Sequence, residues 1–259
     1  MRTSSGADIA VDGDVVVKTH RVGTDPVELA ARLRIAALLG RAGGGPLLAP
    51  LGTVPQPAPD QRWTSSWPRL SAVARTLGDL PWPQAGALLA ALHRCTPPPA
   101  PAHRGVARLR AALQRLPAGA PAVIGAAAAA LPERAWQVSP PGRPVTLVHG
   151  DFHLGQLVRR PGEPWQLIDV DDLGIGDPVW DLARPAGLWA AGLIPHEDWA
   201  AFLEGYRAAG GPAVPRVGDP WITLDPVARA AVVHAAAVGA RYPEDESQTE
   251  LLAACARMA

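Results

Sequence analysis

Hydrophobic and polar positions alternate near the start of the chain, as they do in β-strands. Two apolar runs, residues 7–11 and 15–20, flank an Asp-Gly turn, which predicts a β-hairpin with Lys18 on its second strand. Apolar residues then recur at helical intervals over residues 27–39, after a Thr-Asp-Pro start and before a glycine stop, which predicts a helix. With a further strand predicted over residues 61–67, this part of the chain forms a small sheet carrying one helix.

Helical spacing dominates the chain after residue 81. Predicted helices cover residues 83–93, 107–116, 120–131, 196–209, 226–240 and 246–258. The change of character places a linker in residues 68–80, between an amino-terminal part, residues 1–67, and a larger part, residues 81–259. Pro-rich segments inside the larger part are predicted to be internal connections.

Composition argues against some classes of partner and indicates the cellular compartment. The 24 basic and 24 acidic residues cancel, so no broad basic field favours nucleic acid or a membrane surface as a partner. The start lacks the apolar centre of a secretory signal, no apolar run reaches the length of a membrane span, and Cys95 and Cys255 lack metal-ligand spacing. We therefore expect a soluble, cytoplasmic protein with reduced thiols. Lys18 is the one lysine of the chain, which marks it for a test of function.

The stretch from residue 147 to 183 concentrates acids, histidines and glycines after two short apolar runs. The first run leads into the triplet His149 to Asp151, and the second contains Asp169 near its end. Strands fix the geometry of the loops that follow them, so both clusters are suited to hold ligands. An aspartate in such a loop can accept a proton from a hydroxyl group, and Gln156 with a second carboxylate suits Mg²⁺. The combination suggests phosphoryl transfer.

The motifs HGDFHLGQ, LIDVDD and GDPVWDLA in this stretch resemble those of the aminoglycoside phosphotransferase and choline kinase-like family of small-molecule kinases. The resemblance implies an α+β, bilobal protein-kinase-like fold with a reduced amino-terminal β-sheet lobe and a larger, mostly helical carboxy-terminal lobe. It also implies that Asp151 is the catalytic base and that Asp169 binds Mg²⁺. Gln156 stands where the family has a metal-binding asparagine.

The same resemblance assigns supporting residues. His149, Asp177 and Asp181 would hold the catalytic loop in place. Trp67 would lie in the hinge between the lobes, where backbone groups meet adenine. Residues 1–67 would then be the nucleotide-binding lobe, and the larger part would carry catalysis and the acceptor.

Lys18 matches the strand lysine that contacts the α- and β-phosphates in this fold. Its helix partner should be a glutamate, and Glu28 is the candidate, although the family spacing points one turn later, to Arg32. Only seventeen residues precede Lys18. The glycine-rich loop of the fold is thus reduced to residues 4–6, and its first strand has no counterpart.

We therefore expect an ATP- and Mg²⁺-dependent kinase whose partners are a nucleotide and a small molecule with a hydroxyl group. The acceptor classes are an aminoglycoside or another antibiotic, with a role in antibiotic resistance, a sugar or an amino alcohol. A pseudokinase or nucleotide-sensing module is the alternative, favoured by the short amino-terminal lobe and by Gln156.

Several residues near the motifs have two interpretations. Asp171 and Asp172 either face a cationic substrate or are solvated acids and local caps. Trp180 and Trp189 either belong to the core or wall the substrate site. His153 could extend the two acid clusters into a hydrolase-like metal site, although no further histidine or cysteine is spaced to complete it.

Overall fold

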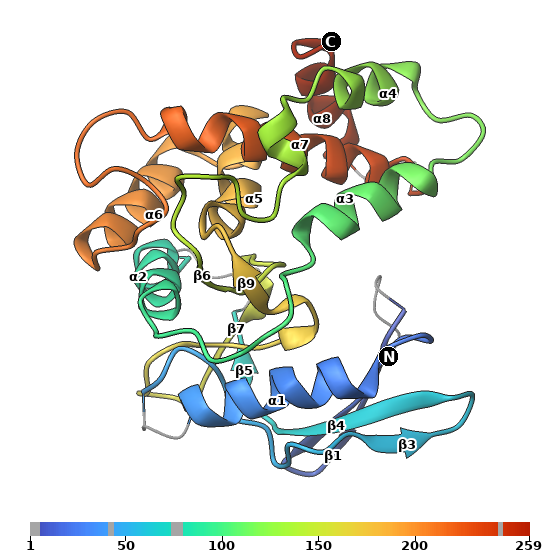
Figure 1. The fold of residues 1–259 in the computed structure, drawn as a ribbon, viewed down its shortest axis with the longest axis vertical. Coiled ribbons are helices and arrows are strands. Elements are labelled where there is room, and N and C mark those ends of the chain that lie inside the picture. The colour runs from blue at the N-terminus through green and yellow to red at the C-terminus, as the bar shows by residue number, and fades with distance from the viewer. Residues whose placement is uncertain (1–5, 41–43, 74–79, 243–245) are drawn as a thin grey trace. The chain divides into compact units, whose positions relative to one another are not determined.

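The computed structural model describes residues 6–40, 44–73, 80–242 and 246–259. The chain divides into two compact units, whose elements are labelled in Figure 1. The first unit comprises residues 1–79, 97–101 and 154–171, and the second comprises residues 80–96, 102–153 and 172–259. The first boundary, after residue 79, falls at the end of the predicted linker. Residues 154–171, by contrast, pack with the first unit although they follow the catalytic motif in the sequence.

A four-stranded antiparallel sheet forms the base of the first unit. Its strands are β1 (Asp8–Asp12), β2 (Val15–Thr19), β3 (Gln56–Ala58) and β4 (Arg62–Pro68), in the order β1-β2-β4-β3. The predicted hairpin is therefore present, and Lys18 lies on an inner strand, opposite Ile9 of β1 and Ser65 of β4. An inner strand is paired on both sides, which fixes the direction of the lysine side chain.

Helix α1 (Pro26–Gly40) covers this sheet with a buried face of apolar residues. Asp25 caps its start, because the Asp25 carboxylate accepts hydrogen bonds from the backbone N–H groups of Val27 at 2.8 Å and Glu28 at 3.4 Å. Leu29 and Leu33 are almost completely buried on the side that packs inward. The helix predicted from the spacing is thus confirmed, including its proline at the first position.

A second, small sheet completes the first unit. It consists of β5 (Ser71–Ala72), β7 (Leu157–Arg159) and β8 (Gln166–Leu167), with 3₁₀ turns at η2 (Leu154–Gln156) and η3 (Val170–Asp172). The second apolar run of the central stretch, residues 165–170, therefore forms only a short strand. It ends early because Asp169 adopts a positive φ of 65°, which no β-strand can contain.

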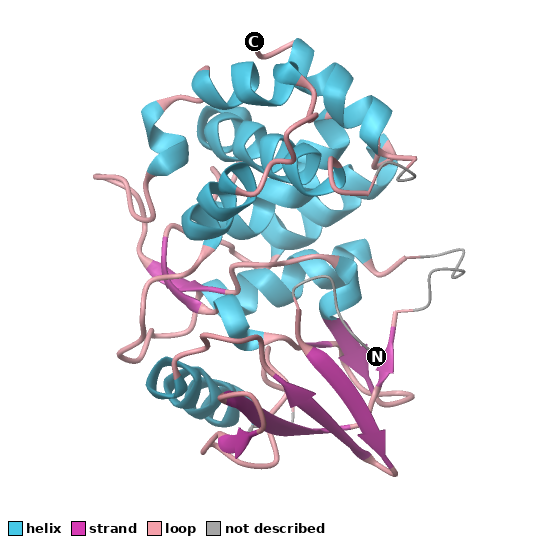
Figure 2. Ribbon diagram, turned by 90° about the vertical axis from the view of Figure 1, so that its right-hand side faces the viewer, coloured by secondary structure: helices cyan, strands magenta, loops and turns pink. Residues whose placement is uncertain are grey.

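Helices make up most of the second unit, as the cyan ribbons of Figure 2 show. They are α2 (Trp82–His93), α3 (Gly105–Gln114), α4 (Ala122–Ala129), α5 (Val179–Ala190), α6 (His196–Ala208), α7 (Trp221–Gly239) and α8 (Gln248–Ala256), with the 3₁₀ turn η1 (Glu133–Trp136). This unit also contains a two-stranded antiparallel pair, β6 (Thr146–Val148) and β9 (Gly174–Gly176). Strand β6 is followed by the HGD triplet, and β9 is followed by Asp177.

Glycines let helices of the second unit approach one another closely. A Cβ atom at Gly86 of α2 would overlap the carbonyl oxygen of Phe202 of α6, and one at Gly205 of α6 would overlap that of Pro83. Both positions therefore require glycine for steric reasons. This contact fixes α2 against α6, and His93 of α2 and Tyr206 of α6 form a buried hydrogen bond at 2.8 Å.

Helix α7 is the central helix of the second unit. It packs against α3, α4, α5 and α8. Among the described helices, α7 is long and apolar enough to cross a membrane by length and composition, and half of the tested segment is buried inside the protein. It begins at Trp221, five residues before the predicted start, because Pro226 lies inside the helix instead of opening it. A proline inside a helix loses one backbone hydrogen bond, and burial of the helix compensates for that loss.

Candidate active site

The loop with the HGD triplet, which the sequence predicts to be the catalytic loop, follows strand β6 and is held by a buried carboxylate of helix α5. Asp181 accepts hydrogen bonds from the backbone N–H groups of His149 at 2.7 Å and Gly150 at 2.8 Å. Gly150 has a φ of 84°, and a Cβ atom there would overlap the carbonyl oxygen of Asp172. The loop therefore requires glycine at this position. The next residue along the chain is Asp151.

A chain of hydrogen bonds supports Asp181 from behind. His93 Nε2 lies 2.9 Å from the Asp181 carboxylate, and His93 Nδ1 lies 2.8 Å from the Tyr206 hydroxyl. Burial would raise the pKa of Asp181, but the hydrogen bond and charge of His93 outweigh it and lower the pKa below its ordinary value. Asp181 is thus an ionised, buried group with each oxygen engaged, as expected of a residue that braces the loop.

Asp177 and His149, the other predicted support residues, act at different places. One Asp177 oxygen accepts the backbone N–H of Val179 at 3.0 Å and so caps α5, and the other accepts from Arg143 Nε at 2.7 Å. The structure therefore places Asp177 at the start of the helix that carries Asp181. His149 is completely buried, and its Nδ1 atom accepts the N–H of Asp151 at 3.4 Å.

Asp151, the predicted base, is surrounded by arginines. Its carboxylate forms ion pairs with Arg108 of α3 and with Arg184 of α5, the latter at 3.6 Å. Burial would raise the pKa of Asp151, but the charges of Arg108 and Arg184 outweigh it, so the pKa lies below its ordinary value. Asp151 is therefore ionised throughout the physiological pH range. No motif in the sequence identifies either arginine.

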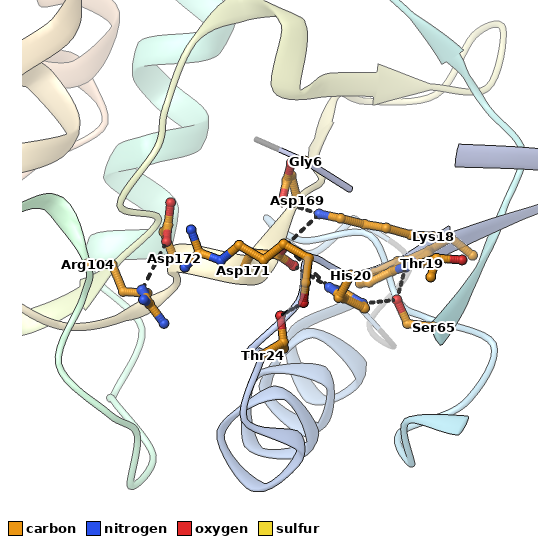
Figure 3. Close-up of polar contacts among 12 residues, drawn as sticks. Gly6, Lys18, Thr19, His20, Thr24, Ser65, Arg104, Asp169, Asp171 and Asp172 are labelled. Carbon is orange, nitrogen blue, oxygen red and sulfur yellow. Dashed lines mark hydrogen bonds and ion pairs between the residues drawn. The ribbon is translucent and has the colours of Figure 1, made fainter. Parts of the chain in front are cut away.

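Lys18 is clamped by two carboxylates of the segment after β8, as Figure 3 shows. Its ammonium lies 2.7 Å from Asp169 Oδ1 and 2.9 Å from Asp171 Oδ2. Burial would lower the pKa of Lys18, but Asp171 and Asp169 together raise it above its ordinary value. The structure thus brings the predicted lysine to the predicted metal-binding aspartate. Asp171 is a second ion-pair partner of Lys18 and not a solvated acid.

His20 joins Asp171 to the neighbouring strand β4. His20 Nδ1 lies 3.2 Å from Asp171 Oδ2, and His20 Nε2 lies 2.8 Å from Ser65 Oγ. The Trp67 indole N–H donates to the same hydroxyl oxygen at 2.9 Å. The Ser65 hydroxyl can therefore donate to His20 Nε2, which leaves His20 Nδ1–H to donate to Asp171. No motif in the sequence points to this role of His20.

The predicted pair between Lys18 and Glu28 is not formed. Glu28 instead pairs with Arg32, one turn later on α1, at 3.0 Å, and its side chain is 42% exposed. The position that the family spacing favours is occupied by the buried Arg32, whose positive charge cannot hold an ammonium. Asp171 supplies the second negative charge that Lys18 would otherwise take from the helix. Trp67, predicted at the hinge, lies in β4 with a buried side chain.

Gln156 and Asp169 are the residues that could hold a divalent cation. The backbone carbonyl of Gln156 accepts the N–H of Ile168 at 2.9 Å, which places Gln156 beside the residue that precedes Asp169. A carboxylate and a carboxamide are hard oxygen donors, and Mg²⁺ needs few protein ligands when phosphate and water complete its shell, so the pair fits this ion. No group of three or more His, Cys, Asp or Glu side chains able to hold a metal ion is found among the described residues.

A lysine paired with two aspartates and an HGD loop braced by a buried aspartate are the features expected from the resemblance to small-molecule phosphotransferases. The family model of the phosphotransferase enzyme family matches residues 8–221, so the chain belongs to this family. The prediction of the family and of the enzyme class is thereby confirmed. The residues Ser4 and Ser5, predicted as remnants of the glycine-rich loop, lie outside the described residues.

Solved structures of small-molecule kinases share the fold. The choline kinase LicA from Streptococcus pneumoniae has a TM-score of 0.62 and 13% identity, over 97% of this chain and 89% of that one. An aminoglycoside phosphotransferase, APH(4)-Ia, in a ternary complex with AMP-PNP and hygromycin B has a TM-score of 0.60 and 14% identity, over 97% and 92%. A microcompartment-associated aminopropanol kinase has a TM-score of 0.58 and 16% identity, over 99% and 87%. The predicted bilobal, kinase-like α+β fold is confirmed.

Proposed function

We propose that the protein transfers the γ-phosphoryl group of ATP to a hydroxyl group of a small molecule, with Asp151 as the catalytic base. The observation that carries this proposal is the loop of Asp151, whose two preceding N–H groups are held by the buried carboxylate of Asp181. Preorganised positioning of this kind supplies most of the acceleration in phosphoryl transfer.

In the proposed reaction the acceptor hydroxyl oxygen forms a bond to the γ-phosphorus, and the bond between that phosphorus and the β-γ bridging oxygen breaks. The hydroxyl proton passes to Asp151, and the products are ADP and a phosphate monoester. Asp151 needs no raised pKa for this role, because the proton leaves late and the carboxylate mainly orients the hydroxyl. Its lowered pKa keeps it ionised and ready to accept.

The first unit supplies the nucleotide-binding groups of this proposal. Lys18 contacts the α- and β-phosphates, and Trp67 lies on the strand whose backbone meets adenine. Asp169 and Gln156 would hold Mg²⁺, which would offset the negative charge of the phosphates when it is bound. Asp171 and His20 keep Lys18 extended toward the phosphates. Solved relatives of this fold contain AMP-PNP, ADP or AMP, which supports a nucleotide as the donor.

The second unit supplies catalysis and the acceptor site. We assign catalysis and acceptor binding to residues 81–259, except residues 97–101 and 154–171, which pack with the first unit. We place the enzyme in the cytoplasm, where its nucleotide is available. Relatives with hygromycin B or spectinomycin bound make an antibiotic one class of acceptor to test.

A nucleotide-sensing pseudokinase is the second candidate, and Gln156 favours it. This buried side chain stands where the family has a metal-binding asparagine and is one methylene longer. A thermal-shift titration with Mg·ATP tests nucleotide binding, because a ligand at 100 times its Kd stabilises by about 2.7 kcal/mol. A shift together with ADP release on addition of an acceptor supports the kinase. A shift without transfer to any acceptor supports the pseudokinase.

A further inference from the structure

Three arginines surround the carboxylates at the catalytic loop. Arg108 of α3 pairs with Asp151 and, at 3.2 Å, with Asp172, while Arg104 lies 3.6 Å from Asp172. Arg184 of α5 lies 3.6 Å from Asp151. Three guanidinium groups therefore face two carboxylates, and the immediate surroundings of the base carry an excess of positive charge.

The remaining groups around the cluster do not cancel this excess. His234 of α7 faces it, and burial together with the charge of Arg108 lowers the pKa of His234 to about 4, so the imidazole is neutral at pH 7. Asp181 is already engaged with His93 and the loop amides. Asp177, which precedes Asp181 in the sequence, forms an ion pair with Arg143.

Arg184 has the capacity to bind a further anion. A guanidinium carries five N–H donors, and the 3.6 Å ion pair with Asp151 leaves most of those of Arg184 for other partners. Its side chain is 48% exposed, so a molecule arriving from solvent can reach it. Arginine binds carboxylate and phosphate groups through two parallel hydrogen bonds, which an amine cannot form with it.

We propose that the acceptor is an anionic alcohol, a hydroxy acid or a hydroxyl-bearing phosphate ester, whose acidic group binds Arg184 and Arg108. This inference rests on the proposed function and specifies its acceptor. A cationic acceptor would meet the like charges of the arginines, at a cost that grows as water is excluded from the site. Aminoglycosides and amino alcohols are therefore disfavoured as acceptors of this enzyme.

The arrangement also links binding of the acceptor to release of the base. In the protein without an acceptor, Arg108 and Arg184 form ion pairs with the Asp151 carboxylate. An acidic group that takes over these two guanidiniums frees the carboxylate oxygens of Asp151 to accept the hydroxyl of the same molecule. The acidic group of the acceptor then replaces the Asp151 carboxylate as the partner of the two arginines, so neither guanidinium is left unpaired.

Acceptors that share a carbon skeleton and differ in one charged group test the proposal directly. Phosphoryl transfer from Mg·ATP is measured with two matched sets: glycerate, glycerol 3-phosphate, glycerol and 3-amino-1,2-propanediol, and glucuronate, glucose 6-phosphate, glucose and glucosamine. Binding of each compound is measured in parallel by calorimetry in the presence of Mg·ADP. We expect binding and transfer to favour the acidic members of a set over their neutral and amine counterparts. The carboxylate and phosphate members distinguish the two kinds of acidic group.

Two variants and a control assign the effect to the arginines. Arg184→Gln is expected to weaken binding of the acidic compounds by roughly 10- to 100-fold, the range for loss of a charged hydrogen bond. Arg184→Glu is expected to shift the preference toward the amine. Arg110→Gln is the matched control, because Arg110 lies on α3 like Arg108 but is exposed and lies over the ring of Trp136.

The outcomes separate this inference from the proposed function. Transfer that prefers the neutral or amine compounds, or failure of every acidic compound to bind, overturns the anionic acceptor. An unchanged affinity for the acids in Arg184→Gln also overturns it. Binding of acids that depends on Arg184, with no transfer to any compound, supports the anion site and counts against phosphotransfer.

Discussion

Replacement of Asp171 by asparagine tests the clamp on Lys18, the feature in which this chain departs most from its predicted site. Asp171→Asn keeps the shape of the side chain and removes its charge. The Lys18 ammonium would keep Asp169 at 2.7 Å and lose an anionic partner at 2.9 Å. His20 would keep a hydrogen-bond acceptor only if the amide oxygen faced it.

The structure sets the size of the expected effect. Removing one partner of a fully buried ion pair costs about 3–5 kcal/mol. Lys18 retains a second carboxylate, and the Asp171 side chain is 27% exposed, so we expect a loss of about 1–3 kcal/mol in the free energy of unfolding. Glu28→Gln is the comparison variant, since the Glu28 carboxylate is 42% exposed and removal of its charge costs at most about 1 kcal/mol, although its partner Arg32 is buried.

Urea unfolding at pH 7 measures both stabilities, and a titration with Mg·ATP measures nucleotide affinity in the same proteins. We expect Asp171→Asn to lower both quantities and Glu28→Gln to leave both near the wild-type values. A larger loss of stability and of nucleotide affinity in Glu28→Gln than in Asp171→Asn would refute the reasoning and restore Glu28 as the partner of Lys18.

Three further changes have expected outcomes. Asp181→Asn should lower the free energy of unfolding by about 3–5 kcal/mol in urea, because it leaves a buried N–H of the catalytic loop without its anionic acceptor; a cost below 1 kcal/mol would argue against the brace. Gly150→Ala should lower the melting temperature and the transfer rate, since the φ of 84° and the nearby carbonyl exclude a side chain; wild-type values for both would contradict this. The pKa values of Asp151, Asp171 and Asp181 are all lowered by folding, so the stability they contribute is complete above the ordinary aspartate pKa of about 3.9 and is lost as the pH falls below it. Folding also lowers the pKa of His234 to about 4, so stability begins to fall when the pH drops below the ordinary histidine pKa of about 6.5. Urea midpoints should therefore be level from about pH 8 to 7, decline below about pH 6.5 and fall further below about pH 4; midpoints that stay level down to about pH 3 would contradict this.

Local patterns predicted much of the fold. The hairpin with Lys18, helix α1 with its Asp25 cap and most helices of the second unit follow from apolar spacing and start signals, which are properties of short segments. The short strands β3, β5 and β9 were not predicted. Strands of two or three residues depend on pairing with distant segments, and their own sequences carry no alternation to read.

The candidate site divides in the same way. The HGD loop and Asp169 were found because their motifs are contiguous in the sequence. His20, Arg108 and Arg184 were missed as functional residues, and neither interpretation of Asp171 included its ion pair with Lys18, because these roles arise from contacts that only the fold creates. Glu28 was chosen because it was the one acid on its helix, but charge in the first turn of a helix also serves the helix itself, and here it pairs with Arg32.

The central claim is that Asp151 is the base of a phosphotransferase, and a comparison of wild-type protein with Asp151→Asn tests it most directly. Transfer of labelled γ-phosphate from Mg·ATP to the best acceptor of the matched sets is followed together with nucleotide affinity. The account predicts that Asp151→Asn loses phosphoryl transfer by about 10²-fold or more, the lower end for removal of a general base, and binds Mg·ATP as the wild type does. Transfer by Asp151→Asn at the wild-type rate would contradict the account.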